Sequence, residues 1–258
     1  MFVDAVLTAG GVPQPGEPLY PYTQGRSKAL LEIGGRPMLQ WILDALGGAE
    51  MIRRVVVIGL GAAETAKLHC AKPIKFFPNQ GGMLENVQAG VDHLTSLEAP
   101  SRHVLLVSAD IPAITPAIVD WSVTTSLQTD HEAYYSAVRR EDMERRFPGC
   151  RRSYVYFRDG AFTGGDMNMI ATALVSRANP LWMALIAARK NALKQARLIG
   201  WDALVLLALR CLTIAQAERL VCQRLKVRAR LLISPYAEVG MDIDKPLQYE
   251  MVKRALEK

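Results

Sequence analysis

Glycines and a lysine near the start of the chain have types and a spacing that could bind a phosphate. Ala9-Gly10-Gly11 directly follows an apolar run, and Lys28 comes after a proline-rich stretch. Glycines let backbone N–H groups approach a phosphate or a base because no Cβ intervenes, and a lysine adds a point charge. Each residue alone is typical of a turn or a solvated surface, but the combination indicates a phosphate-binding loop.

An aspartate in the middle of the chain could hold a divalent cation. Asp110 lies in Ser108-Ala109-Asp110-Ile111-Pro112, just after an apolar run at 104–107. Sheets of α/β proteins bind ligands at the carboxyl ends of their strands, and magnesium needs few carboxylates when water and substrate phosphates complete its shell. Helix capping is the alternative role, but Thr115 before Pro116 is the better cap. We therefore interpret Asp110 as a metal ligand.

A second acidic motif lies near the end of the chain. It reads Gly240-Met241-Asp242-Ile243-Asp244-Lys245-Pro246 and precedes a helical pattern. Asp244 stands where a helix N-cap would, with Pro246 in the first turn. The same carboxylate could also bind a metal. Both roles stay open at this point because capping and metal binding need not exclude each other.

Apolar runs and helical patterns alternate around these residues. Residues 2–7, 55–58 and 104–107 predict buried strands, whereas 38–46 and 245–256 have helical spacing. Strands that alternate with helices indicate a parallel sheet covered on both faces. We therefore expect an α/β fold with a three-layer, mostly parallel sheet whose strand ends carry the candidate residues.

The composition changes in the second half of the chain. Arginines become frequent from about residue 139, and a helical stretch that ends near residue 225 is broken at Gly200. Residues 227–233 then predict the last strand. Because no repeat or flexible linker separates this part, we expect one domain over 1–258 with a helical insertion at about 139–225, before the last strand.

The charge balance favours anionic partners. The net charge is +6 and the isoelectric point about 9.2, which attracts anions without identifying them. The four cysteines lie far apart, as in reduced cytosolic proteins and unlike a disulfide framework or a zinc site. The first residues hold an acid, Asp4, and no basic segment, so no signal peptide is predicted. The longest apolar run, 203–209, is too short to span a bilayer. We expect a cytoplasmic protein.

Residues 7–46 resemble the N-terminal signature of the sugar-phosphate and molybdenum-cofactor nucleotidyltransferases, the MobA-like family. The shared parts are the glycine loop, Lys28, and the turn Leu31-Glu32-Ile33-Gly34-Gly35-Arg36-Pro37-Met38 into a helix. The resemblance implies a Rossmann-like sheet of the GT-A type. The glycine loop would contact the nucleotide's base and ribose, and Lys28 would contact its triphosphate. The family's loop arginine has no direct counterpart here, and Arg26 is the one candidate for that role.

The resemblance extends to the later motifs. The family's strand-Asp-x-Pro and Asp-Ile-Asp-x-Pro elements correspond to Asp110 and Asp244, which would together hold Mg²⁺. Gly164-Gly165-Asp166 stands where the family has a Gly-Gly-Asn turn that faces the acceptor, with a carboxyl group here in place of the amide. Asn79-Gln80-Gly81-Gly82 resembles its base-reading loop, and an ordinary helix entry fits equally well. The resemblance thus assigns catalysis to Lys28, Asp110 and Asp244, and nucleotide binding to Ala9, Gly10, Gly11, Arg26, Lys28, Gln80, Gly81 and Gly82.

The activity that the resemblance implies is a magnesium-dependent transfer of a nucleoside monophosphate from an NTP to a phosphorylated or otherwise anionic acceptor. Catalysis would then rest on positioning and charge neutralisation. A glycosyltransferase of related fold, with Asp242-x-Asp244 as its metal motif, and a non-catalytic nucleotide sensor are the alternatives. The late position of that motif disfavours the first, and the intact Lys28, Asp110 and Asp244 disfavour the second. The base and the acceptor stay open, and we expect no nucleic-acid partner.

An apolar segment of the insertion must be buried against another surface. It has too many apolar residues for one face of an isolated surface helix, and basic residues lie on both sides of it. Core packing or a homodimer is the preferred interpretation, and contact with anionic lipid is the alternative. The apolar residues are Leu198, Ile199, Trp201, Leu204, Val205, Leu206, Leu207 and Leu209; the basic ones are Arg189, Lys190, Lys194, Arg197, Arg210 and Arg219.

Overall fold

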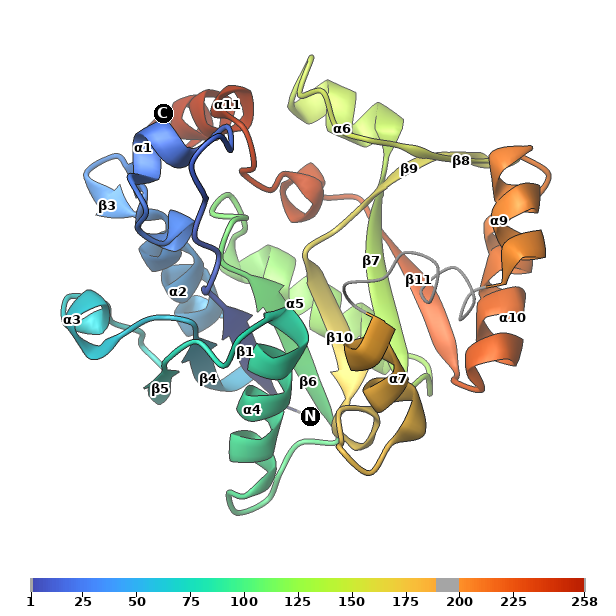
Figure 1. The fold of residues 1–258 in the computed structure, drawn as a ribbon, viewed down its shortest axis with the longest axis horizontal. Helices are drawn as coiled ribbons and strands as arrows, with labels where there is room; N and C mark the ends of the chain where they lie inside the picture. Colours follow the sequence, from blue (N-terminus) through green and yellow to red (C-terminus); the bar gives the residue numbers. More distant parts are fainter. Residues whose placement is uncertain (1, 189–199, 258) are drawn as a thin grey trace.

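The structure, a computed structural model, describes residues 2–188 and 200–257 (Figure 1). Within these residues the strands form one nine-stranded sheet, in the order β5-β4-β1-β6-β10-β7-β9-β8, with β11 also paired to β7. The strands of this sheet are β1 (Val3–Thr8), β4 (Ile52–Ile58), β5 (Ile74–Phe77), β6 (His103–Ser108), β7 (Ala133–Arg139), β8 (Val155–Phe157), β9 (Gly160–Gly164), β10 (Met167–Ala171) and β11 (Ala229–Ser234).

The sheet has a parallel half and a mixed half. Strands β5, β4, β1 and β6 are parallel, and Leu7 of β1 pairs with Val57 on one side and Val107 on the other. Strand β10 is antiparallel to both β6 and β7, β9 is antiparallel to β7 and β8, and β11 is parallel to β7. The expected α/β fold is confirmed, and the sheet, which was expected to be mostly parallel, is mixed with a parallel core. The antiparallel strands escaped the sequence analysis because β8 to β10 have only three to five residues each.

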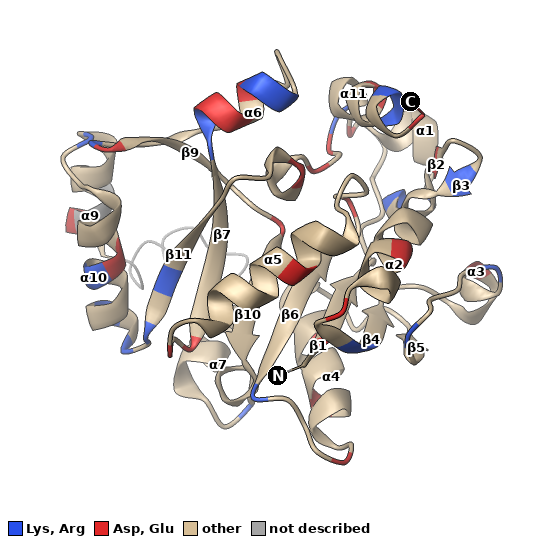
Figure 2. Cartoon of the chain, turned by 180° about the vertical axis from the view of Figure 1, so that it is seen from behind, with Lys and Arg blue, Asp and Glu red and all other residues tan. Residues whose placement is uncertain are grey.

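Helices cover both faces of the sheet. Helices α2 (Met38–Gly48) and α5 (Pro116–Leu127) pack on one face, and α4 (Met83–Thr95) and α7 (Pro180–Ala188) on the other (Figures 1 and 2). The alternation of β1 matches this arrangement, since Val3, Ala5 and Leu7 face the first layer and Val6 the second. The other elements are α1 (Tyr20–Thr23), α3 (Ala62–Thr65), α6 (Arg140–Arg146), α9 (Trp201–Ala208), α10 (Ile214–Leu225), α11 (Pro246–Leu256), the short ribbon of β2 (Glu32–Ile33) and β3 (Arg36–Pro37), and three 3-10 turns at Lys28–Leu30, Thr172–Leu174 and Ala237–Gly240.

Two glycines allow close packing beside the first strand. A Cβ on Gly59, which follows β4 with φ of +125°, would lie 2.2 Å from the nitrogen of Gly10. A Cβ on Gly90 would lie 2.6 Å from Cγ1 of Val6, so this glycine lets α4 approach β1. Gly59 therefore brings the end of β4 against the loop that follows β1, which explains why a glycine stands at this position.

Helices precede the last strand within the expected insertion at about 139–225, whose first part also contains β8, β9 and β10 of the main sheet. Helices α7, α9 and α10 come before β11, and α9 leaves Trp201, Val205, Leu206 and Leu209 exposed. Leu198, Ile199 and the basic residues between 189 and 197 lie outside the described residues. Among those that are described, no helix is long and apolar enough to cross a membrane. The homodimer and the lipid contact stay predictions.

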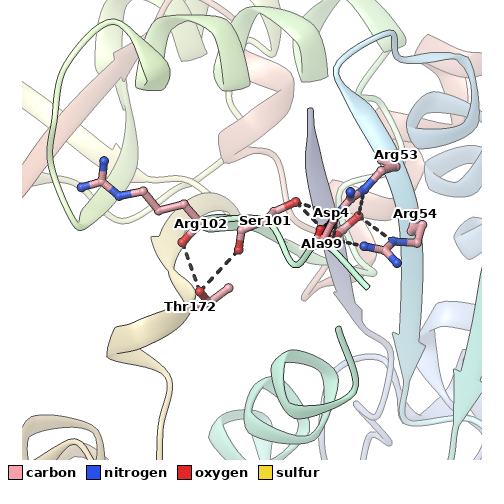
Figure 3. Close-up of polar contacts among 7 residues, drawn as sticks. All are labelled: Asp4, Arg53, Arg54, Ala99, Ser101, Arg102 and Thr172. Carbon is pink, nitrogen blue, oxygen red and sulfur yellow. Dashed lines mark hydrogen bonds and ion pairs between the residues drawn. The ribbon is translucent and has the colours of Figure 1, made fainter. Parts of the chain in front are cut away.

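A closed ion cluster lies at the amino end of β1 (Figure 3). The side chain of Asp4 is fully buried and accepts hydrogen bonds from Arg53 (3.0 and 2.8 Å), Arg54 (3.1 and 3.2 Å) and the hydroxyl of Ser101 (3.2 Å). Burial alone would raise the pKa of Asp4, but the two guanidinium groups outweigh it and hold the pKa below its usual value. We call Asp4, Arg53, Arg54 and Ser101 the Asp4 cluster.

Candidate active site

The glycine loop leaves the carboxyl end of β1 and is held by the strands beside it. The N–H of Ala9 donates to the carbonyl of Ile58 at the end of β4 (2.7 Å). The hydroxyl of Ser27 donates to the carbonyl of Ala9 (2.7 Å), and the N–H of Lys28 donates to the carbonyl of Gly11 (2.9 Å). These bonds return the far end of the proline-rich loop to the glycines, so Lys28 lies directly beside Gly11.

Lys28 joins the two predicted metal-site acids. Its Nζ lies 2.5 Å from Oδ2 of Asp110 and 2.8 Å from Oδ1 of Asp244. Burial would lower the pKa of Lys28, but the two carboxylates outweigh burial and raise it, so the side chain is an ammonium at neutral pH. The pKa of Asp244 is held below its usual value, because Lys28 more than offsets the opposite effect of burial. The structure therefore brings all three predicted catalytic residues together.

A second group of charges lies next to this centre. Arg152 forms an ion pair with Asp242, and the backbone N–H of Ile243 donates to the carbonyl of Asp110 (2.9 Å). The carbonyl of Asp166 accepts from the N–H of Ser108 (2.9 Å), which places the acceptor-turn residue beside the end of β6. Burial, together with Asp110 and Asp242, raises the pKa of Asp166 to about 8. A protonated Asp166 can donate a hydrogen bond as the amide of an asparagine does.

Two cavities meet at Gly11 and Lys28. The first cavity, of about 260 Å³, contains the glycine loop and Asp110. The second cavity, of about 370 Å³, contains Asp244 and the start of the proline-rich loop. Besides Gly11 and Lys28, the first cavity is lined by Thr8, Ala9, Gly10, Ala29, Asn79, Gly81, Gly82, Met83, Asn86, Ser108, Ala109 and Asp110, and the second by Val12, Pro13, Glu17, Pro18, Leu19, Asp244 and Lys245.

Two predicted nucleotide-binding residues lie away from these cavities. The side-chain amide of Gln80 donates to the carbonyl of Pro78 (2.8 Å), and Gln80 does not line the first cavity, although Gly81 and Gly82 do. Arg26 lines a separate cavity of about 230 Å³ with Tyr22, Glu32 and Tyr249. Nucleotide contacts by Gln80 and Arg26 stay predictions.

The donor set fits a hard divalent cation in part. Oδ1 of Asp110 is buried, and among the described residues it has no hydrogen-bond partner, so one oxygen of this carboxylate is available to a ligand. No group of three or more His, Cys, Asp or Glu side chains within the described parts of the chain is placed to hold a metal by itself. Two carboxylates with substrate phosphates are nevertheless the set that magnesium commonly uses. Asp110 and Asp244 thus fit a magnesium ion that arrives with a nucleotide.

The starts of helices α5 and α11 show that neither Asp110 nor Asp244 is an N-cap. Thr115 is the N-cap of α5 and its side chain accepts from the N–H of Ile118, so Asp110 is not needed as a cap. The N-cap of α11 is Lys245, and no side chain caps this helix end, so the expectation that Asp244 occupies the N-cap position is wrong by one residue. Pro246 in the first turn shifts the helix start because its ring favours the first helical position. The carboxylate of Asp244 is bonded to Lys28 instead.

The predicted acceptor turn leads from β9 into β10. A Cβ on Gly164 would lie 2.4 Å from the hydroxyl of Tyr135, and a Cβ on Gly165 would lie 2.8 Å from Cγ1 of Val239. The pKa of Tyr135 is raised by burial and further by Asp166 and Asp242. The turn therefore places the hydroxyl of Tyr135 close to the second group of charges.

Sequence reasoning missed two residues that surround this site. Lys245 lines the second cavity, and Tyr135 approaches the predicted acceptor turn. Asn79, the first residue of the loop that resembles the base-reading loop, lines the first cavity. The position of Lys245 directly after Asp244 was a signal that could have identified it. Tyr135 has no such signal, because a tyrosine in the middle of a strand is most often part of the core.

Comparison with known proteins gives a consistent family. The model of the "MobA-like NTP transferase domain" family matches residues 22–191. A curated 2-C-methyl-D-erythritol 4-phosphate cytidylyltransferase from Synechococcus sp. (strain WH7803) is 36% identical over 85 residues. That alignment covers 31% of this chain and 37% of the cytidylyltransferase, so the chain spans little more than a third of this relative.

Solved structures share the fold over almost the whole chain. A hypothetical transferase from Thermus thermophilus is 33% identical with a TM-score of 0.81, and the match covers 98% of this chain and 100% of the other. A CMP:2-keto-3-deoxy-manno-octonic acid synthetase in complex with CTP is 12% identical with a TM-score of 0.59, over 99% of this chain and 98% of the other. The second likeness shows the fold alone.

Proposed function

The chain belongs to the MobA-like NTP transferase domain family, and from this premise we propose that it transfers a nucleoside monophosphate from an NTP to a phosphorylated acceptor. The observation that carries the proposal is the arrangement of Lys28. Its ammonium lies between Asp110 and Asp244 and at the junction of the two cavities. An NTP with its nucleoside in the first cavity and its β- and γ-phosphates in the second would place the α-phosphate at this lysine.

The second cavity supports a triphosphate as the donor. Lys28 and Lys245 both line it and bring two cationic side chains to a space next to Gly11. A diphosphate tail carries several negative charges, and lysines are suited to hold it as point charges. A sugar nucleotide would place an uncharged sugar in the same space, which disfavours the glycosyltransferase alternative.

Positioning and charge neutralisation account for the reaction. An oxygen of the acceptor phosphate attacks the α-phosphorus, the bond from this phosphorus to the bridging oxygen of the β-phosphate breaks, and pyrophosphate leaves with the electron pair. Lys28 neutralises charge that develops on the α- and β-phosphates. Arg152, whose buried Nε has no hydrogen-bond partner among the described residues, would bind the incoming phosphate. Asp166 would orient that phosphate by donating a hydrogen bond.

Asp110 and Asp244 would hold magnesium. When bound, the ion would polarise the phosphate oxygens and neutralise part of their charge. The two carboxylates come from the end of β6 and from the loop before α11, so folding must bring these segments together before the ion can bind. The dependence on magnesium and the identity of the base belong to this proposal.

Pyrophosphate release tests the proposal directly. Each of the four common NTPs is incubated with magnesium and with a panel of sugar phosphates and polyol phosphates, and released pyrophosphate is measured. We expect release that depends on both an NTP and a phosphorylated acceptor. Nucleoside diphosphate sugars serve as the control donor: transfer of sugar without pyrophosphate would support the glycosyltransferase instead. NTP binding without any turnover across the panel would support the sensor.

A further inference from the structure

An apolar cavity lies under α10, on the side of the acceptor turn. It has a volume of about 260 Å³ and lies between this helix and strands β7, β8 and β11. We call it the α10 cavity. Most of its lining residues are apolar, and the carboxylate of Glu218 accepts the N–H of Leu231 (2.6 Å). The lining residues are Tyr135, Phe157, Ile214, Ala217, Glu218, Val221, Ala229, Arg230 and Leu231.

Tyr135 connects this cavity to the candidate active site. Its ring is part of the cavity wall, whereas its hydroxyl lies against Gly164, where a Cβ would approach to 2.4 Å. Gly164 is two residues before Asp166, which lies beside Ser108 at the end of β6. The tyrosine side chain is 55% exposed, although most tyrosines inside a strand pack against a partner. A ligand at the acceptor turn can therefore extend along this ring into the cavity.

The proposed occupant follows from this placement. We propose that the α10 cavity binds an apolar group, of about the size of a phenyl ring or a six-carbon chain, that is attached to the anionic acceptor. The size agrees with engineered apolar cavities, where roughly 150 Å³ is enough to bind benzene. The inference rests on the proposed function, because it requires the phosphate of the same molecule to bind beside Arg152.

Charges around the turn suit the other end of such a molecule. Arg152, which is paired with Asp242, provides a cation whose buried Nε has no hydrogen-bond partner among the described residues. An acceptor with a phosphate at one end and an apolar group at the other matches this order of charges and apolar surface. Sugar phosphates without an apolar substituent would leave the α10 cavity unused.

Binding of alkyl phosphates tests the inference without any need for turnover. Ethyl, butyl and hexyl phosphate are titrated into the full-length protein by calorimetry, with inorganic phosphate as the reference. Each buried methylene strengthens binding by about fourfold. We expect affinity to rise from ethyl to hexyl phosphate, by on the order of 100-fold if all four added methylenes are buried.

Substitutions that fill the cavity locate the effect. Ala217→Trp and Val221→Phe each add volume to the α10 cavity, and Ala217→Ser is the matched control at the first position. Both filling variants are expected to remove the dependence on chain length, while binding of inorganic phosphate and of NTP stays within about twofold. Two cavity-filling variants are used because one of them could fail to fold. Thermal unfolding shows whether each variant is folded.

The outcomes separate this inference from the proposed function. Equal affinity for all three alkyl phosphates, or a chain-length dependence that persists in both filled variants, would overturn the inference. Pyrophosphate release from sugar phosphates could still occur in that case, and the proposed function would stand. Conversely, chain-length-dependent binding that is lost on filling, with no pyrophosphate release for any acceptor, would leave the binding site in place and remove the proposed function.

Discussion

The two ends of strand β1 carry buried charges of opposite character. At the amino end, one carboxylate, Asp4, is bonded to two arginines and a serine. At the carboxyl end, Lys28 is bonded to two carboxylates, and a further carboxylate, Asp242, is paired with Arg152. The Asp4 cluster has more cations than acids, and each oxygen of its carboxylate is bonded. The candidate active site has more acids than cations, and an oxygen of Asp110 has no partner among the described residues.

This difference separates a structural cluster from a binding site. A buried carboxylate that is fully bonded has no capacity left for a ligand, so Asp4 can contribute only to the fold. A buried carboxyl oxygen without a partner is costly, and a protein retains it where a ligand completes the bonding. We therefore expect substitutions at the two ends to affect different properties: stability at Asp4 and turnover at the active site. The five predictions below test that division.

The largest effect is expected for the two metal-site acids. Asp110→Asn and Asp244→Asn each remove one negative charge with little change in volume. We expect kcat in magnesium to fall on the order of 10³-fold, because charge stabilisation at the reacting phosphates is lost. The melting temperature should stay close to that of the wild type. If either variant retains near wild-type turnover, that residue is not a ligand and the site is misplaced.

The opposite result, a loss of stability without a loss of turnover, is expected for Asp4→Asn. This substitution removes the negative charge with which Arg53 and Arg54 are paired, and breaking a buried pair costs about 3–5 kcal/mol. The free energy of unfolding, from denaturant titration, should fall accordingly, while kcat measured well below the melting temperature stays unchanged. A loss of turnover in folded protein would contradict the division between the two ends.

The effect of Asp4 should also depend on pH. Its pKa in the folded protein lies below that of the unfolded chain, so its contribution to stability is present above the unfolded value of about 3.9 and is lost as pH falls through the folded value. The difference in unfolding free energy between wild type and Asp4→Asn should therefore shrink below about pH 4. A difference that is independent of pH would show that the carboxylate charge is not the cause.

A smaller and more selective effect is expected for Lys28→Ala. Loss of a charged hydrogen-bonding partner of the phosphates should weaken NTP binding by about 10- to 100-fold, and NMP binding less, because an NMP lacks the β-phosphate that Lys28 would also contact. Lys245→Ala tests the second cation of the same cavity, and Lys253→Ala in α11 is the control. Calorimetry with NTP and with NMP measures the loss of affinity for each nucleotide in each variant. Equal losses for NTP and NMP would remove the argument for a triphosphate contact.

The smallest effect is expected for Asp166→Asn. The amide keeps a hydrogen-bond donor at the position where the family has asparagine, so kcat/KM for the acceptor should stay within about threefold of wild type. Asp166→Ala removes the donor and should raise KM for the acceptor by about tenfold. A large loss of kcat/KM in Asp166→Asn would show that the reaction requires the carboxylate of Asp166 and not only a hydrogen-bond donor at this position.

The sequence alone determined most of the parallel half of the fold, β5 excepted, and the positions of the main site residues. Apolar runs predicted β1, β4, β6 and β11 within about three residues at each end, because buried strands need continuous apolar side chains. The glycine loop and Asp110 could be assigned from local order, since each directly follows a predicted strand. Residues at the carboxyl ends of parallel strands lie at the same edge of the sheet, so the sequence also predicted that the glycine loop and Asp110 lie close together.

Only the tertiary structure decided which charges pair. Lys28 and Asp244 are 216 residues apart, and nothing in the local sequence distinguishes their contact from the capping role that was also expected. The pairs of Arg152 with Asp242 and of Asp4 with Arg53 and Arg54 likewise cross long stretches of chain. The pairing of β7 with the short strand β9 places Tyr135 beside Gly164, and β9, with five residues, carries too few for a periodic signal. Contacts between segments depend on packing of the whole sheet, whereas strand and loop patterns depend on neighbours in sequence.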